Sequence, residues 1–136
     1  MDALQKSVGV LKYSSNGNDF YRLTVEVDQE ISNYYRSLIP KWHDVNRPRW
    51  PAHITVVRPE KEKPVFLEHW NKHNNREIEF QYTPTVFQGK VYFWLNAFCT
   101  ELEQIRKELG LPVRSEFTLP PEGFTKCFHI TIANLK

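Results

Sequence analysis

The chain contains the heptapeptide Pro51-Ala52-His53-Ile54-Thr55-Val56-Val57, which returns near the C-terminus as Cys127-Phe128-His129-Ile130-Thr131-Ile132-Ala133. β-Branched residues dominate both copies, so both are expected to be strands. Successive side chains of a strand point to opposite faces, so each copy presents its histidine and threonine on one side. The apolar residues between them point to the other side and can anchor the strand in a core.

One His-x-Thr on a strand is usually an ordinary half-buried position, because imidazole and hydroxyl groups both fit such a surface. A repeat is harder to explain in that way. The chain has 5 histidines, and two of them, 76 residues apart (129 minus 53), carry the same surroundings. The pair therefore predicts a common site to which both strands contribute.

The paired His-Ile-Thr-Val and His-Ile-Thr-Ile segments resemble the signature of the two-histidine (2H) phosphoesterase superfamily. That group includes RNA 2′,3′-cyclic phosphodiesterases, 2′,5′-oligoadenylate phosphodiesterases and phage proteins that cleave cyclic-nucleotide immune signals. The resemblance implies a bilobal α+β fold, in which two related antiparallel sheets flanked by helices surround a central cleft. It also implies chemistry without a metal ion or cofactor.

By that resemblance, the expected activity is hydrolysis of a 3′-5′ or 2′-5′ phosphodiester in a small cyclic nucleotide or short oligonucleotide. A cyclic dinucleotide used in immune signalling is one such substrate, as for a phage protein that acts against host defence. Hydrolysis of RNA ends that carry a 2′,3′-cyclic phosphate is the alternative within the enzymes. A non-catalytic nucleotide- or RNA-binding module is the alternative from another class.

The catalytic candidates are His53, Thr55, His129 and Thr131. An imidazole has an ordinary pKa near 6.5, so one ring can act as a base and the other as an acid near neutral pH. The threonine hydroxyls can donate hydrogen bonds to phosphoryl oxygens. Which histidine is the base stays open. The candidates for substrate binding are Arg58, Tyr13, Trp50, Trp94 and Lys126.

Arg58 stands five positions after His53, where some members of the superfamily carry an arginine. Strict alternation places it on the face opposite His53, so it reaches the cleft only if the chain turns at Pro59. For the basic, aromatic connector at 41–50, a solvated loop with one packed tryptophan is the alternative to a nucleotide-binding segment. For Trp94, packing in the core is the alternative to stacking on a base.

Length and composition favour one domain spanning 1–136. The chain is 40% hydrophobic and 25% charged, with a net charge of +2, which suits a small anionic ligand better than a long nucleic-acid duplex. Its 2 cysteines are too few for a disulfide framework and indicate reduced thiols in a cytoplasmic protein, or in the host cytoplasm for a phage protein. No apolar leader or membrane span is expected. The oligomeric state stays open.

The rest of the chain predicts a mixture of strands and helices. Strands are expected at 8–13, 20–27, 77–82 and 90–97, and helices at 29–39, 64–73 and 101–109, with Asp28 and Thr100 as N-caps. His69 and His73 lie four apart, but without a third ligand they do not predict a metal site. The segment 112–126 is expected to be a loop that borders the cleft, either as a lid or as an ordinary surface loop. The two halves repeat each other only in part, because the helix at 64–73 has no equivalent in the first half.

Overall fold

The computed structural model describes residues 3–16, 20–113 and 128–136. Within these residues, eight strands form one sheet: β1 (Gln5–Ser15), β2 (Tyr21–Val27), β3 (Val45–Asn46), β4 (His53–Val57), β5 (Glu77–Tyr82), β6 (Phe87–Gln88), β7 (Tyr92–Phe98) and β8 (Phe128–Leu135). The helices are α1 (Gln29–Ser37), α2 (Thr100–Glu108) and a 3-10 turn, η1 (Leu67–His69). The predicted α+β class is confirmed.

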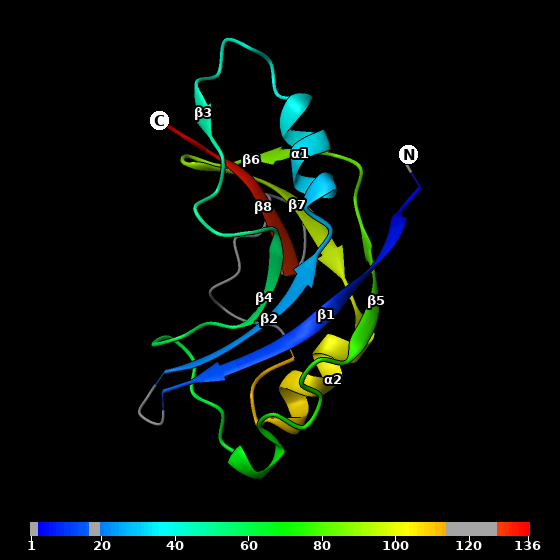
Figure 1. Ribbon diagram of the computed structural model, residues 1–136, viewed down its shortest axis with the longest axis vertical. Helices are drawn as coiled ribbons and strands as arrows, with labels where there is room; N and C mark the ends of the chain where they lie inside the picture. Colours follow the sequence, from blue (N-terminus) through cyan, green and yellow to red (C-terminus); the bar gives the residue numbers. More distant parts are fainter. Residues whose placement is uncertain (1–2, 17–19, 114–127) are drawn as a thin grey trace.

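Every strand pairing is antiparallel, and the strand order is β3-β8-β4-β2-β1-β5-β7-β6. An additional pairing joins β7 to β8, so the path β8-β4-β2-β1-β5-β7 returns to its own start. The two sheets expected from the resemblance are thus joined into one continuous sheet. Both predicted motif strands, β4 and β8, lie side by side within it (Figure 1).

The two helices cover different motif strands. Helix α1 packs against β8, and α2 packs against β4. In Figure 1 the two helices lie toward opposite ends of the long axis, α1 in cyan and α2 in yellow. Each helix therefore supports the motif strand that is distant from it in sequence.

Strand alternation explains the core. On β2 Leu23 and Val25 have no exposed surface, whereas Arg22 and Glu26, on the other face, are accessible. Helix α1 begins as predicted, because the Asp28 carboxylate accepts a hydrogen bond from the Glu30 N–H at 2.9 Å. The buried apolar residues in it and just after it are Ile31, Tyr35 and Ile39, whereas Tyr34 and Leu38 are exposed.

Two helix predictions are corrected by the structure. The predicted helix at 64–73 is only the short turn η1, in which the N–H groups of His69 and Trp70 bond the carbonyls three residues back, at Phe66 and Leu67. Asn71 then adopts a φ of 71°, a left-handed conformation that asparagine tolerates and that ends a helical segment. Thr100 is the first residue of α2 rather than its N-cap, which is Cys99.

Gly9 lets β1 approach β2 closely. A Cβ added at this position would lie 2.5 Å from both the Glu26 carbonyl oxygen and Val25 Cγ1. The Glu26 oxygen belongs to the backbone of a paired strand and cannot rotate away, so Gly9→Ala is expected to lower the free energy of unfolding by about 1–3 kcal/mol. Urea denaturation measures this loss. Ser7→Ala, on the same strand, is the control and should change stability by less than about 0.5 kcal/mol; an equal effect of the two substitutions would contradict the close approach.

Candidate active site

The two motif strands bring four polar side chains to one surface. Ile54 of β4 pairs with Ile130 of β8, and both isoleucines are fully buried. The residues on either side of them keep partial exposure on the opposite face: His53, Thr55, His129 and Thr131. The alternation predicted from the two sequence copies is thus present in both strands.

All four side chains line the same cavity, which has a volume of about 600 Å³. This size falls within the usual range of small-molecule sites. The other lining residues lie just before and just after β4, at the start of β7, and near the end of β8: Pro48, Arg49, Trp50, Arg58, Val91, Tyr92 and Asn134. Three segments distant in the sequence, at 48–58, 91–92 and 129–134, therefore form one hollow, with Arg49 and Arg58 at its wall.

Arg58 reaches the cavity because β4 contains a bulge. Thr24 of β2 pairs with Thr55, but the next pair is Leu23 with Val57, so Val56 has no partner in the register. Val56 and Val57 are consecutive and both buried. The extra residue reverses the alternation, so Arg58 returns to the face of His53. The position of Arg58 in the cavity is thus due to the bulge rather than to a turn at Pro59.

Strand β8 has the same irregularity at the equivalent place. Trp94 of β7 pairs with Thr131, and the next pair is Phe93 with Ala133, so Ile132 is skipped. This brings Asn134 into the cavity, five positions after His129, just as Arg58 comes five positions after His53. Sequence reasoning missed Asn134. The available signal was the pair of consecutive apolar residues that follows x-Thr in both copies, which breaks a period of two.

An arginine from the opposite helix holds each bulge. Arg106 of α2 donates from Nη1 to the Val56 carbonyl oxygen at 2.7 Å. Arg36 of α1 donates from Nη1 to the Ile132 carbonyl oxygen at 3.1 Å. Both carbonyls belong to the skipped residue, whose backbone groups leave the regular ladder. The two arginines therefore satisfy the polar groups that the bulges release.

Arg106 also organises the segment that carries Arg58. Its Nη2 lies 2.7 Å from Glu62 Oε2, with the arginine side chain fully buried and the glutamate side chain 6% exposed. Its Nε donates to the Pro112 carbonyl at 2.8 Å. The other oxygen of Glu62 accepts from the Arg58 N–H at 3.1 Å. The backbone of Arg58 is thus fixed by a carboxylate that is itself held by a buried arginine.

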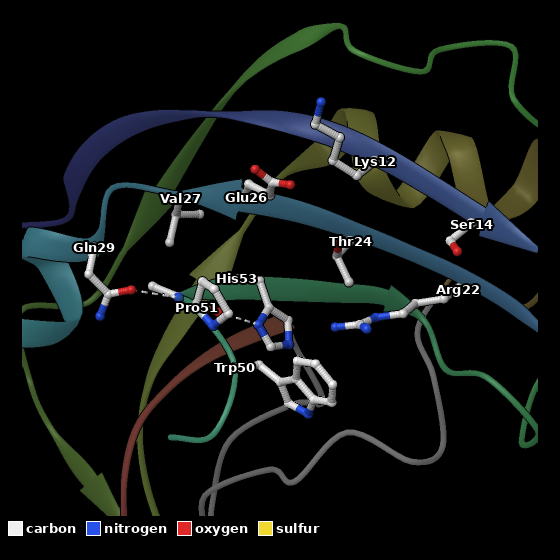
Figure 2. A pocket seen from close by; sticks show the side chains of 11 residues that line it. Lys12, Ser14, Arg22, Thr24, Glu26, Val27, Gln29, Trp50, Pro51 and His53 are labelled. Atoms are coloured by element: carbon white, nitrogen blue, oxygen red, sulfur yellow. Dashed lines mark hydrogen bonds between the residues drawn. The ribbon is translucent and has the colours of Figure 1, made fainter. Parts of the chain in front are cut away.

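His53 is arranged to be neutral with a free Nε2. Its Nδ1 lies 2.7 Å from the Pro51 carbonyl oxygen, and since a carbonyl can only accept, Nδ1 carries the proton (Figure 2). Burial lowers the pKa of His53 below 6.5; the Pro51 carbonyl opposes this shift, and the charges of Arg22 and Arg58 add to it. At neutral pH, Nε2 of His53 is therefore unprotonated and can act as a base.

Burial, the Arg58 charge and His53 together lower the pKa of His129 to about 4, and burial is the largest of these causes. Nδ1 of this ring is buried and has no hydrogen-bond partner among the described residues. Asn96 lies directly opposite on β7, and its Nδ2 likewise has no partner there. The Asn96 Oδ1 accepts from the Trp94 indole N–H at 3.1 Å, so the amide orientation leaves the Nδ2 donor available.

The structure separates the predicted substrate-binding residues. Trp50 and Arg58 line the cavity with the four motif side chains. Tyr13 packs edge-on against Trp70 at 4.9 Å between ring centroids, and burial raises its pKa to about 12. Trp94 is 5% exposed, and its ring stacks on Phe87 rather than lining the cavity. Lys126 and most of the predicted loop at 112–126 lie outside the described residues.

No family model, no curated protein and no solved structure matches this chain.

Within the described ranges, no helix has the length and apolar character needed to cross a membrane. The same ranges contain no cluster of three or more His, Cys, Asp or Glu side chains arranged to hold a metal ion. His73, one of the two histidines four apart, bonds Glu108 at 3.1 Å. The function must therefore be argued from the geometry of the cavity itself.

Proposed function

We propose that the chain is a metal-independent phosphodiesterase of the two-histidine type, with a bilobal arrangement in which each half contributes one motif strand. The observation that carries the proposal is the cavity of about 600 Å³ lined by both histidines and both threonines. The substrate class is a small cyclic nucleotide or short oligonucleotide with a 3′-5′ or 2′-5′ phosphodiester. Hydrolysis of a terminal 2′,3′-cyclic phosphate is the second candidate, since it needs the same groups around one phosphorus atom.

The hydrogen bond of His53 and the position of Asn96 opposite His129 support an assignment of roles. His53 has Nδ1–H directed at the Pro51 carbonyl, so its Nε2 can accept the proton of the attacking hydroxyl or water. An Asn96 amide that donates to His129 Nδ1 would put the proton of His129 on Nε2. His53 is then the base, and His129 is the acid that gives its proton to the leaving oxygen as the phosphorus–oxygen bond breaks.

The remaining residues of the cavity suit the charge that develops on phosphorus. Thr55 and Thr131 have hydroxyl donors beside the two rings. The charge of Arg58 is close enough to both histidines to lower the pKa of each. Burial and Arg58 lower the pKa values of the two histidines. A phosphodiester anion bound between these groups raises them again, because a nearby negative charge favours the imidazolium. Substrate binding thereby supplies the protonated acid that the empty cavity lacks at neutral pH.

This proposal predicts an acidic optimum for kcat/KM. The reaction needs a neutral His53 and a protonated His129, and in the free protein the singly protonated pair is most populated above about pH 4 and below pH 6.5. Because His129 has the pKa near 4, most of these pairs carry the proton on His53, and the form with protonated His129 is a minor fraction that follows the same pH dependence. Above this range both rings lose their protons and kcat/KM should fall. The optimum of kcat should lie at higher pH, because the bound anion raises both pKa values. Initial rates from pH 4 to 9 test this; a kcat/KM that rises steadily to pH 9 contradicts it.

The activity itself is tested with a substrate panel in EDTA, read by mass spectrometry. The panel comprises cyclic dinucleotides, cyclic trinucleotides, 2′,5′-oligoadenylate and RNA that ends in a 2′,3′-cyclic phosphate. Cleavage of at least one member at an unchanged rate in EDTA is expected, and the mass and isomer of the product identify the broken bond. Loss of turnover in EDTA with recovery on added metal would refute the scheme. Tight binding in calorimetry without turnover of any member would favour the non-catalytic binding module.

A further inference from the structure

A second hollow, of about 390 Å³, lies on the other side of His53. It shares His53 and Trp50 with the first cavity, so the two hollows meet at the proposed base. The remaining walls come from β1, β2, the start of α1 and the residues before β4: Lys12, Ser14, Arg22, Thr24, Glu26, Val27, Gln29, Pro51 and Ala52 (Figure 2). The β1 and β2 residues that line this hollow are not among the substrate-binding residues predicted from the sequence.

Arg22 is the distinctive group of this hollow. It extends from β2 toward His53 and Trp50 (Figure 2), and its guanidinium carbon lies 5.2 Å from the centre of the Trp50 ring. Its charge acts on His53, whose pKa it lowers. Arg22 is half-buried, and no carboxylate in the described part of the chain pairs with it. The other cation of the hollow, Lys12, is already bonded to Asn75 Oδ1.

An arginine in this position can bind an anion, since the Glu26 carboxylate lines the same hollow but forms no ion pair with it. A half-buried guanidinium loses hydration, and planar arginine donors match phosphate oxygens. The scissile phosphate belongs between the two histidines, where Arg58 already provides a charge. Trp50 lines both hollows, and the Arg49 guanidinium lies over the same ring as Arg22, at 5.6 Å. Trp50 is 55% exposed, so its indole also has surface for contact with a base. The arrangement suits one base and one further phosphate.

We infer that the hollow around Arg22 and Trp50 is a second nucleotide subsite, an inference that rests on the proposed function. It takes the phosphodiester adjacent to the scissile one, with the phosphate on Arg22 and the attached base on Trp50. The substrate then carries at least two phosphodiesters. A linear oligonucleotide and a cyclic oligonucleotide share this chemistry, whereas a nucleoside 2′,3′-cyclic monophosphate has no group for the subsite.

The binding test uses His129→Asn, which removes the proposed acid and keeps the second hollow intact. Calorimetric titration compares the trinucleotide ApApA, a cyclic dinucleotide, and adenosine 2′,3′-cyclic monophosphate. The ligands with two phosphodiesters are expected to bind about tenfold or more tightly than the monophosphate, since a charged hydrogen bond and a stacked base are added. Adding Arg22→Ala should remove that advantage and leave monophosphate binding unchanged. Adding Lys6→Ala, an exposed change on β1, is the control.

The outcomes separate the two proposals. Equal affinities for all three ligands, or an advantage that survives Arg22→Ala, overturn the second subsite even if the wild-type protein cleaves the panel. A loss that depends on Arg22 supports the subsite even if no turnover is found, and in that case the hydrolytic function fails while binding stands. If only ApApA gains affinity, the ligand is linear, and if only the cyclic dinucleotide gains it, the ligand is cyclic.

Discussion

Replacing either motif histidine with alanine is expected to lower kcat by about 10²–10⁴-fold, the usual contribution of general acid–base catalysis. His53→Ala removes the nitrogen that takes a proton, and His129→Ala removes the group that returns one. Each step is needed for the same displacement at phosphorus. The double variant is therefore expected to be about as inactive as either single variant, because residues that act as a unit are not additive.

Single-turnover and steady-state rates for the three variants measure this non-additivity. His69→Ala is the matched control, since His69 lies in η1 and does not line either hollow. It should retain the wild-type rate. Far-ultraviolet circular dichroism and urea denaturation verify that each variant is folded. A single variant with full activity, or a double variant whose losses multiply, would remove the acid–base pair from the proposal.

Replacing Arg106 with methionine is expected to lower the free energy of unfolding by about 3–5 kcal/mol, because it breaks a buried ion pair by removing one partner. The Glu62 carboxylate loses the Arg106 guanidinium, and the Val56 and Pro112 carbonyls lose the hydrogen bonds that it donates. Since domains are stable by only about 5–15 kcal/mol, this is a large fraction of the total. Urea denaturation gives the loss as a shift of the midpoint at constant slope.

The chain provides a matched control for Arg106. Arg76 pairs with Glu101 at 2.7 Å, the same separation as between Arg106 and Glu62, but its two side chains are 50% and 51% exposed. Arg76→Met is expected to change stability by less than about 1 kcal/mol, as exposed ion pairs do. Removing both buried charges, with Arg106→Met and Glu62→Leu together, should recover part of the loss. Equal effects of the two methionine variants would contradict the structural role of Arg106.

The sequence predicted the strands of the site but not the irregularities within them. A period of two correctly put His53 with Thr55 and His129 with Thr131 on one face. The same rule put Arg58 on the wrong face and gave no reason to select Asn134. Bulges cause both failures, and each depends on a tertiary contact: the hydrogen bonds that Arg106 and Arg36 donate to the skipped residues. Local patterns do not contain that information.

Arg22 was missed for a related reason. Alternation on β2 correctly grouped it with Thr24 and Glu26, away from the buried Leu23 and Val25. The sequence does not reveal that β4 becomes the neighbour of β2, which brings His53 opposite Glu26. Trp94, in contrast, was included as a substrate-binding candidate but does not line the cavity. Its aromatic ring was compatible with stacking on a substrate and with core packing, and the structure shows that it packs against Phe87.

The absence of a full helix at 64–73 makes the two halves more alike than the sequence suggested. In each half two long strands pair, a helix follows the second of them, and that second strand pairs with a bulged motif strand: β1, β2, α1 and β4 in the first half, and β5, β7, α2 and β8 in the second. The repeated order supports an internal duplication. Nothing in the composition of 64–73 indicated that its first N–H groups would bond the end of α2.

The exchange of arginines between the halves limits how this fold can be divided. Arg36 leaves the first half to support Ile132, and Arg106 leaves the second half to support Val56. A fragment containing only one repeat would keep its histidine and threonine but lack the guanidinium that shapes their strand. The two fragments should therefore fold only when they are mixed. A single repeat should fold on its own only as a domain-swapped dimer, in which two copies exchange their helices.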